Sequence, residues 1–219
     1  MIYWFVKGGP VMWPLLLCSI IATAVTIERI LFWIKEAASK DPQLVHRLLH
    51  LTERGLFDEA VASAKGSGDA VARVLLNGLS HRHFSLEGAL EVAVQEELKR
   101  MKRYLGVLDT LVTVAPLLGI FGTVLGILQA FGALEGQIPD PQIVARGIAQ
   151  AVITTVAGLG IAIPTLIGYN YFTAKVEDAA NRLSTDVTNF EILYQKGKHR
   201  NRQRADGTAP APLETAEGR

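Results

Sequence analysis

One long apolar stretch, residues 105–134, restricts the folding of this 219-residue chain more than any other feature. It is long enough to cross a bilayer as an α-helix. Gly119, Gly122 and Gly126 recur in it at helical spacing and share one side of that helix. Because a helix side without side chains lets another helix approach closely, this pattern predicts tight helix packing in a membrane. Thr123 lies beside these glycines as the only hydroxyl in the middle of the segment.

The composition indicates membrane helices combined with a sizeable aqueous part. Hydrophobic residues make up 49% of the chain and charged residues 20%, which is too apolar for an ordinary soluble domain and too charged for a chain wholly in lipid. The single cysteine, Cys18, excludes an intrachain disulfide. The first seven residues lack the basic start and the cleavage site of a signal peptide, so we expect the first apolar segment to be retained.

Hydropathy predicts an all-α membrane protein with three spans and long cytoplasmic helical extensions. The spans are expected over residues 11–34, 105–134 and 143–174. The parts outside the membrane are expected to be a short periplasmic N-terminus over 1–10, a cytoplasmic helical insert over 35–104, a periplasmic loop over 135–142, a cytoplasmic helix over 175–196 and a disordered basic tail over 197–219.

Local signals in the insert predict where its helices begin. Asp41 followed by Pro42 is a cap followed by a first-turn proline. Ser85 can cap a helix that continues into the second span. The pairs His46/His50 and His81/His83 could suggest a metal site, but no carboxylate or cysteine completes a zinc-like ligand set. We therefore expect these histidines on solvated helix faces, and no metal or cofactor.

The basic residues predict the orientation in the membrane. The insert carries eleven Lys and Arg between Lys35 and Arg103, whereas residues 132–141 carry none and Lys7 is the only one before the first span. The positive-inside rule then places the N-terminus in the periplasm and the C-terminus in the cytoplasm. The basic cluster over 99–103 adjoins the second span, so we expect it to contact anionic membrane lipid rather than nucleic acid.

Polar side chains on spans two and three are the candidate functional residues: Asp109, Thr110, Thr113 and Thr123 on span two, and Gln150, Thr154, Thr155 and Thr165 on span three. One interpretation is that each threonine bonds its own helix backbone and that the small residues only permit close packing. The other is that the polar residues line a lumen or a groove for a partner helix. Their gathering beside small residues on two helices favours the second interpretation. The residues expected to pack the helices are Pro116, Gly119, Gly122, Gly126, Gly158, Gly160 and Pro164.

Spans two and three lack a group that could carry a proton at depth. Proton relays use Asp, Glu or His, and Asp109, near the cytoplasmic end, is the only such residue deep in the two spans. If protons cross here, a second protein has to supply the titrating group. Glu28 and Arg29 at the inner end of span one have two interpretations: an anchoring salt bridge, or a site where Glu28 carries a proton. Because charged side chains at helix ends reach water at low cost, the salt bridge is favoured.

Two span motifs resemble a known family. The sequences APLLGIFGTVLG over 115–126 and GIAQAVITTVAGLGIAIPTLIGYNYF over 147–172 are similar to the paired signature of the MotA/TolQ/ExbB proton channel family. The three spans, the long insert and the pair Glu28 and Arg29 resemble the ExbB branch most and TolQ next, while the MotA branch has four spans. The resemblance extends over about residues 11–194.

The resemblance implies a protein of the bacterial inner membrane that is a motor subunit rather than an enzyme. Members form a homopentamer whose second and third spans enclose the single spanning helices of two ExbD- or TolR-like subunits. An aspartate on the partner helix takes up and releases protons, and the threonines matching Thr123 and Thr155 face it. The resulting motion is passed to a TonB- or TolA-like protein.

One residue departs from the family pattern, because Gln150 stands where a glutamate is usual. Glutamine keeps the size and the hydrogen bonds of glutamate but loses the charge. Either this position is not a required proton carrier, or proton coupling in this protein differs from that of the family. The alternative function is a membrane scaffold that conducts nothing. A membrane enzyme is excluded, because the sequence offers no nucleophile–base pair, metal set or phosphate loop.

Overall fold

The computed structural model describes residues 8–132 and 141–205, and within these ranges all regular structure is helical. The predicted periplasmic N-terminus over 1–10, periplasmic loop over 135–142 and basic tail over 197–219 fall wholly or in part on residues 1–7, 133–140 and 206–219, which lie outside the described residues. The chain divides into two units. Unit 1 holds residues 1–33 and 102–177, and unit 2 holds residues 34–101 and 178–219. The all-α membrane fold predicted from hydropathy is confirmed by three helices long and apolar enough to cross a membrane.

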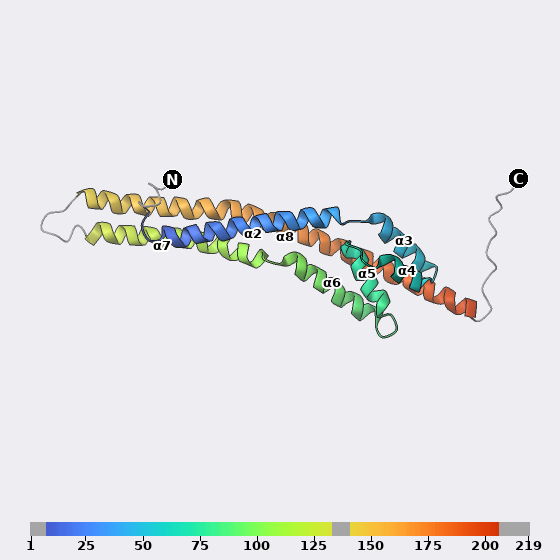
Figure 1. Ribbon diagram of the computed structural model, residues 1–219. Helices are drawn as coiled ribbons and strands as arrows, with labels where there is room; N and C mark the ends of the chain where they lie inside the picture. The colour runs from blue at the N-terminus through green and yellow to red at the C-terminus, as the bar shows by residue number, and fades with distance from the viewer. Residues whose placement is uncertain (1–7, 133–140, 206–219) are drawn as a thin grey trace. The chain divides into compact units, whose positions relative to one another are not determined.

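Unit 1 is a bundle of these three helices (Figure 1). They are α2 over Met12–Ala38, α7 over Leu105–Gly132 and the N-terminal part of α8, which runs over Pro141–Ala205. Val11 and Leu15 at the start of α2 pack with Ala115 of α7 and Ala162 of α8. One to two turns further along α2, Cys18 and Ala22 pack against Leu111 of α7. Small and aliphatic side chains at helical spacing thus hold α2 against both other helices.

Helices α7 and α8 meet along a line of buried small residues, which we call the seam. Its members are Ala115, Gly119, Gly122, Gly126 and Ala130 on α7, and Gly147, Ala151, Thr154, Gly158 and Ala162 on α8. A Cβ placed on Gly126 would lie 2.5 Å from the Gly147 carbonyl oxygen, and one on Gly158 would lie 2.5 Å from the Ala115 carbonyl oxygen. The two backbones therefore touch, and no larger residue fits at these positions without moving a helix.

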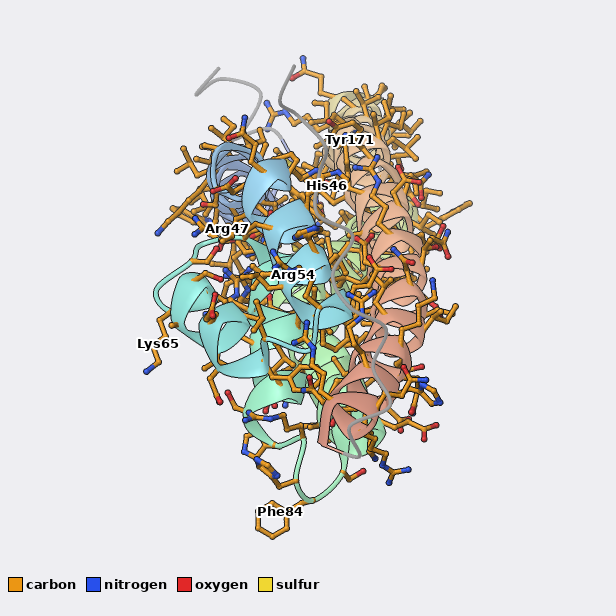
Figure 2. All side chains as sticks on the ribbon, turned by 90° about the vertical axis from the view of Figure 1, so that its right-hand side faces the viewer. His46, Arg47, Arg54, Lys65, Phe84 and Tyr171 are labelled. Carbon is orange, nitrogen blue, oxygen red and sulfur yellow. The ribbon has the colours of Figure 1, made fainter. Side chains whose placement is uncertain are left out.

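Unit 2 contains four short helices and the C-terminal part of α8 (Figure 1). The four are α3 over Pro42–Glu53, α4 over Phe57–Ala64, α5 over Ala70–Ser80 and α6 over Leu86–Lys102. The predicted starts are confirmed: the Asp41 carboxylate accepts a bond from Leu44 N at 3.0 Å, and the Ser85 hydroxyl accepts one from Gly88 N at 3.1 Å. Figure 2 shows the Phe84 ring standing away from the loop between α5 and α6.

Four charged residues form a network within unit 2. Arg73 donates two hydrogen bonds to the Glu97 carboxylate, at 2.7 and 2.9 Å. Arg100 donates to Glu36 at 2.7 Å and lies 3.0 Å from Glu97. The side chains of Glu36 and Glu97 are 8% and 13% exposed, so these carboxylates need the guanidinium groups as partners. The network fastens α5 and α6 to the last turn of α2.

The structure differs from expectation at two helix boundaries. The helix from Ser85 does not continue into span two, because Tyr104 between α6 and α7 has a positive φ of 64° that interrupts the helical hydrogen bonds. The cytoplasmic helix does not stop at residue 196, because α8 continues to Ala205. The Asn201 amide donates to the Gly55 carbonyl oxygen at 2.9 Å, and this contact with a residue far away in sequence accounts for the extension.

The seam yields a paired test. Gly158→Ala places a Cβ against the Ala115 carbonyl oxygen and should cost about 1–3 kcal/mol of stability. Gly160→Ala is the matched control, since nothing lies within 4 Å of a Cβ there and alanine favours helix by up to about 1 kcal/mol. We expect thermal unfolding in detergent, followed by circular dichroism, to show a lowered midpoint for Gly158→Ala alone. Equal midpoints for the two variants would contradict this packing.

The ion network predicts a pH-dependent effect of Glu97→Gln. Burial alone would raise the pKa of Glu97, but the hydrogen bond from Arg73 and the charges of Arg73 and Arg100 outweigh it and hold the pKa below its usual value. A carboxyl with a lowered pKa in the folded state stabilises the protein above its ordinary pKa of about 4.3, and that contribution is lost as pH falls through the lowered value. Glu97→Gln should therefore cost about 2 kcal/mol at pH 7 and progressively less below pH about 4.

This effect is measured by thermal unfolding of wild type and variant at pH 7, 5 and 3. The raised pKa of Asp186, caused first by burial and then by nearby Asp69, affects both proteins and cancels in the difference. Asp58→Asn is the control, because the Asp58 side chain is 94% exposed where it pairs with Arg82, and such pairs contribute about 0–1 kcal/mol. A difference between wild type and Glu97→Gln that does not change with pH would show that the network is not ionised as described.

Candidate functional site

Thr123 and Thr155 lie at the edge of the seam, half-buried. The Thr155 hydroxyl donates across to α7, to the Gly119 carbonyl oxygen at 3.3 Å, and the Thr123 hydroxyl donates to the Ile120 carbonyl oxygen of its own helix at 2.5 Å. A hydroxyl has one donor and two acceptor positions. Both oxygens therefore keep acceptor capacity toward whatever lies against this edge.

The contacts of α2 show on which side of the α7–α8 pair the two hydroxyls lie. Leu118 and Leu125 of α7, and Ala157 and Ile161 of α8, pack against the cluster that α2 contributes to. At about 100° per residue, Thr123 points about 140° away from Leu118 around α7. By the same geometry Thr155 points about 160° away from Ala157 around α8. Both hydroxyls thus belong to the face of α7 and α8 opposite α2, which we call the open face.

Gln150 does not share this face with Thr155. The Gln150 side chain is half-buried and lies against Gly9: a Cβ placed on Gly9 would be 2.8 Å from the Gln150 Cδ. At about 100° per residue, Gln150 points only about 20° away from Ala157 around α8. It therefore lies on the α2 side. Its Nε2 is buried with no hydrogen-bond partner among the described residues.

Thr154 belongs to the seam itself. Its side chain is fully buried against Gly122, and its hydroxyl bonds its own helix, to the carbonyl oxygens of Ala151 at 2.9 Å and Gln150 at 3.2 Å. The sequence pattern predicts that Gln150, Thr154 and Thr155 line one lumen or partner groove. The structure separates the three into the α2 side, the seam and the open face.

The remaining candidates are spread along α7 and α8. Thr113 and Asp109 are both exposed. The Thr113 hydroxyl lies 3.4 Å from the carbonyl oxygen of Asp109, four residues earlier in α7. Pro116 is half-buried one turn from the seam glycines, within a continuous α7. Gly160 and Pro164 are both exposed, outside the contact between α7 and α8. Gly119, Gly122, Gly126 and Gly158 all lie in the seam.

Glu28 and Arg29 form a bidentate ion pair on neighbouring positions of α2, with N–O distances of 2.5 and 2.6 Å. The Arg29 side chain is only 1% exposed, and its guanidinium carbon lies 4.5 Å from the Phe32 ring centroid. A buried guanidinium needs an anionic partner, which Glu28 supplies. This geometry is that of the anchoring salt bridge.

Sequence reasoning missed two features. Gly147 is as tightly packed as the predicted glycines, and its signal was present in the small residues at 147, 151, 154 and 158, which repeat at helical spacing. The network of Glu36, Arg73, Glu97 and Arg100 joins residues far apart in sequence; only the i,i+3 pair of Glu97 and Arg100 could have been found beforehand.

Over residues 8–132 and 141–205, no group of three potential metal ligands comes together.

The open face can hydrogen-bond, but it cannot titrate at depth. Its exposed side chains beside Thr123 and Thr155 are apolar, among them Ile120, Ile127, Leu159 and Leu166. Such a surface suits an apolar helix that carries one polar group level with the two hydroxyls. A protonated carboxyl could donate to either hydroxyl oxygen, and an ionised carboxylate could accept from a hydroxyl that rotates away from its backbone partner.

Comparison with known proteins places these motifs in a family. The profile of the MotA/TolQ/ExbB proton channel family matches residues 67–185. The ExbB-like 1 protein of Synechocystis sp. is 33% identical over 199 residues, which cover 88% of this chain and 78% of that protein. TolQ of the Tol-Pal system of Haemophilus influenzae is 37% identical over 123 residues, covering 56% of this chain and 51% of that protein.

A third relative is also named ExbB. The biopolymer transport protein ExbB of Salmonella typhimurium is 29% identical over 181 residues, covering 76% of this chain and 72% of that protein. The matched residues 67–185 include the whole seam and both hydroxyls of the open face. With a family profile over more than half of its length and relatives named ExbB and TolQ, the chain belongs to the MotA/TolQ/ExbB proton channel family.

Proposed function

We propose that this chain is the ring-forming subunit of a motor of the bacterial inner membrane that is driven by the proton motive force. Five copies surround the spanning helix of an ExbD- or TolR-like subunit, with the open faces of α7 and α8 turned inward. The N-terminus lies in the periplasm, the C-terminus in the cytoplasm, and basic residues of the insert meet anionic lipid. The family membership and the similarity to proteins named ExbB and TolQ support this proposal.

The single observation that carries the mechanism is the placement of Thr123 and Thr155 together on the open face, among apolar side chains. Because this chain offers hydroxyls and no titrating group there, the partner helix supplies a carboxyl that takes up and releases the proton. Each hydroxyl stabilises one state of that carboxyl by accepting or donating a hydrogen bond. A partner acid that alternates between these states changes its fit to the ring, and that change moves the helix.

The free energy available is sufficient for such a step. One elementary charge crossing about 100 mV releases roughly 2.3 kcal/mol. That amount shifts a two-state equilibrium by about fifty-fold, which is enough to bias the position of the partner helix in one direction. The motion is then passed to a TonB- or TolA-like protein that acts on the outer membrane.

We assign the other candidates different roles in this proposal, in keeping with where they lie. Thr154 and the seam glycines keep α7 and α8 at a fixed distance, so that the two hydroxyls stay level. Gln150 fixes the start of α2 against α8 and is a neutral positioning residue rather than a proton carrier. Glu28 and Arg29 anchor the inner end of α2, and Asp109 and Thr113 lie closer to the cytoplasmic end of the pathway.

Removing the two hydroxyls tests the proposal. In inverted membrane vesicles holding the complete complex, Thr123→Val and Thr155→Val should each lower proton flux at least tenfold, which corresponds to a barrier higher by about 1.4 kcal/mol. Valine keeps the shape approximately and removes only the hydrogen-bonding oxygen. Flux is followed with a pH-sensitive dye, and the mass of the purified complex checks that five copies and the single-span subunit remain together.

Thr165→Val is the matched control, because Thr165 is buried on α8 and its hydroxyl bonds only the Ile161 carbonyl oxygen of its own helix, at 2.7 Å. Its flux should stay within twofold of wild type. If Thr123→Val and Thr155→Val both conduct normally in an intact complex, the motor proposal is wrong and the non-conducting scaffold takes its place.

A further inference from the structure

The last turns of α8 carry a dense group of cations that the motor proposal does not use. We call residues 196–204 the basic segment; its charged or titratable side chains are Lys196, Lys198, His199, Arg200, Arg202 and Arg204. No Asp or Glu occurs from residue 192 to residue 205. The whole segment is helical, so these side chains project from a defined surface rather than from a flexible tail.

Two contacts hold the basic segment against the turn between α3 and α4. Gly197 lies so close to the Thr52 carbonyl oxygen that a Cβ would collide with it, and Gly55 N would be only 3.1 Å from that Cβ. One turn later, the Asn201 amide donates to the Gly55 carbonyl oxygen at 2.9 Å. The segment is therefore docked on a fixed support within unit 2.

Beside this contact lies a hollow of about 420 Å³, lined by Lys196, His199, Arg200 and Gln203 of α8 and by Glu53 of α3. The four α8 residues follow helical spacing and share one face, so they present nitrogen donors to one space. Glu53 is the one acidic residue in the lining, and it is 3.9 Å from the Lys196 Nζ. Within the described part of the chain, no carboxylate pairs with His199 or Arg200.

These cations lie outside the stretch of sequence in which basic residues orient a membrane span. Lys196 follows residue 174, the expected end of the third span, by 22 residues. Positive-inside signals act only within about 15–20 residues of a span. The orientation of the third span therefore does not account for the charge of the basic segment.

The lining also disfavours single-stranded nucleic acid, which is bound by stacking bases on aromatic rings. The nearest aromatic residue before the segment, Tyr194, is buried and packs against Phe57 with ring centroids 4.9 Å apart. What remains is recognition by charge and hydrogen bonds in a space of small-ligand size. Lys196 and Arg200 are one turn apart, about 6 Å along the helix, so linked anionic groups satisfy both, whereas one small anion satisfies only one.

We infer that this hollow binds a soluble cytoplasmic ligand with two or more linked phosphate groups, as in a polyphosphate or a nucleoside polyphosphate. Lys196 and Arg200 contact successive phosphates, and His199 and Gln203 donate further hydrogen bonds. The bound ligand stabilises the folded unit 2 by mass action, and the stabilisation rises with the logarithm of the ligand concentration once that concentration exceeds the dissociation constant.

Calorimetric titration of the full-length protein in detergent with tripolyphosphate, in a metal-free buffer, tests this site. The hollow variant is Lys196→Gln with Arg200→Gln. The matched control is Lys198→Gln with Arg202→Gln, which removes the same charge from the same segment at positions that do not line the hollow. We expect the hollow variant to bind at least tenfold more weakly and the control less than threefold more weakly. Circular dichroism confirms that both variants are folded.

Parallel titrations with adenosine triphosphate, duplex RNA and anionic lipid vesicles distinguish the sources of phosphate. Binding of tripolyphosphate or of the nucleotide with the expected variant pattern supports the site, as does a raised thermal midpoint of the wild type in the presence of that ligand. An equal loss in the two variants would show diffuse charge attraction and overturn the proposal. It would also be overturned if the wild type bound only duplex RNA or only anionic vesicles, or bound nothing.

Discussion

The backbone contact between α7 and α8 is the constraint on which the membrane unit depends. In lipid, apolar side chains gain nothing by leaving their surroundings, so helices associate through close van der Waals packing and hydrogen bonds. Glycines at 126, 147 and 158 give these two helices that closeness, with backbone atoms in direct contact. The bond from the Thr155 hydroxyl to the Gly119 carbonyl oxygen can form only at such a separation. The seam therefore determines where the hydroxyls of the open face lie.

The placement of α2 gives this pair of helices two different sides. One side is covered by small and aliphatic residues of α2, and the other presents two hydroxyls among exposed apolar side chains. A helix pair covered on one side only has one face left for another chain. The cytoplasmic unit rests on different forces, since a network of two carboxylates and two guanidinium groups joins its helices. Hydroxyl chemistry in lipid and ion pairing in water thus belong to separate parts of the chain.

The sequence predicted the features that depend on local composition. Hydropathy located the helices of the membrane unit, helical spacing identified Gly119, Gly122 and Gly126, and Asp41 marked the start of α3. Helical period places Gln150 and Thr155 about 140° apart around α8, but it does not say which of the two faces α2 and which faces the open side. The helical end of α8 was also missed, since Gly197 and Asn201 are held by residues near position 55, about 145 positions away. The 64° φ of Tyr104 has no sequence signal comparable to a glycine.

Site-directed cross-linking in native membranes shows whether the face opposite α2 receives a helix from another chain. With the only native cysteine replaced by Cys18→Ala, single cysteines are introduced by Thr123→Cys, Thr155→Cys or Leu125→Cys. We expect the first two to cross-link to a small single-span protein and Leu125→Cys, on the α2 side, not to do so. Cross-links from Leu125→Cys alone, or from none of the three in an assembled complex, would contradict this expectation.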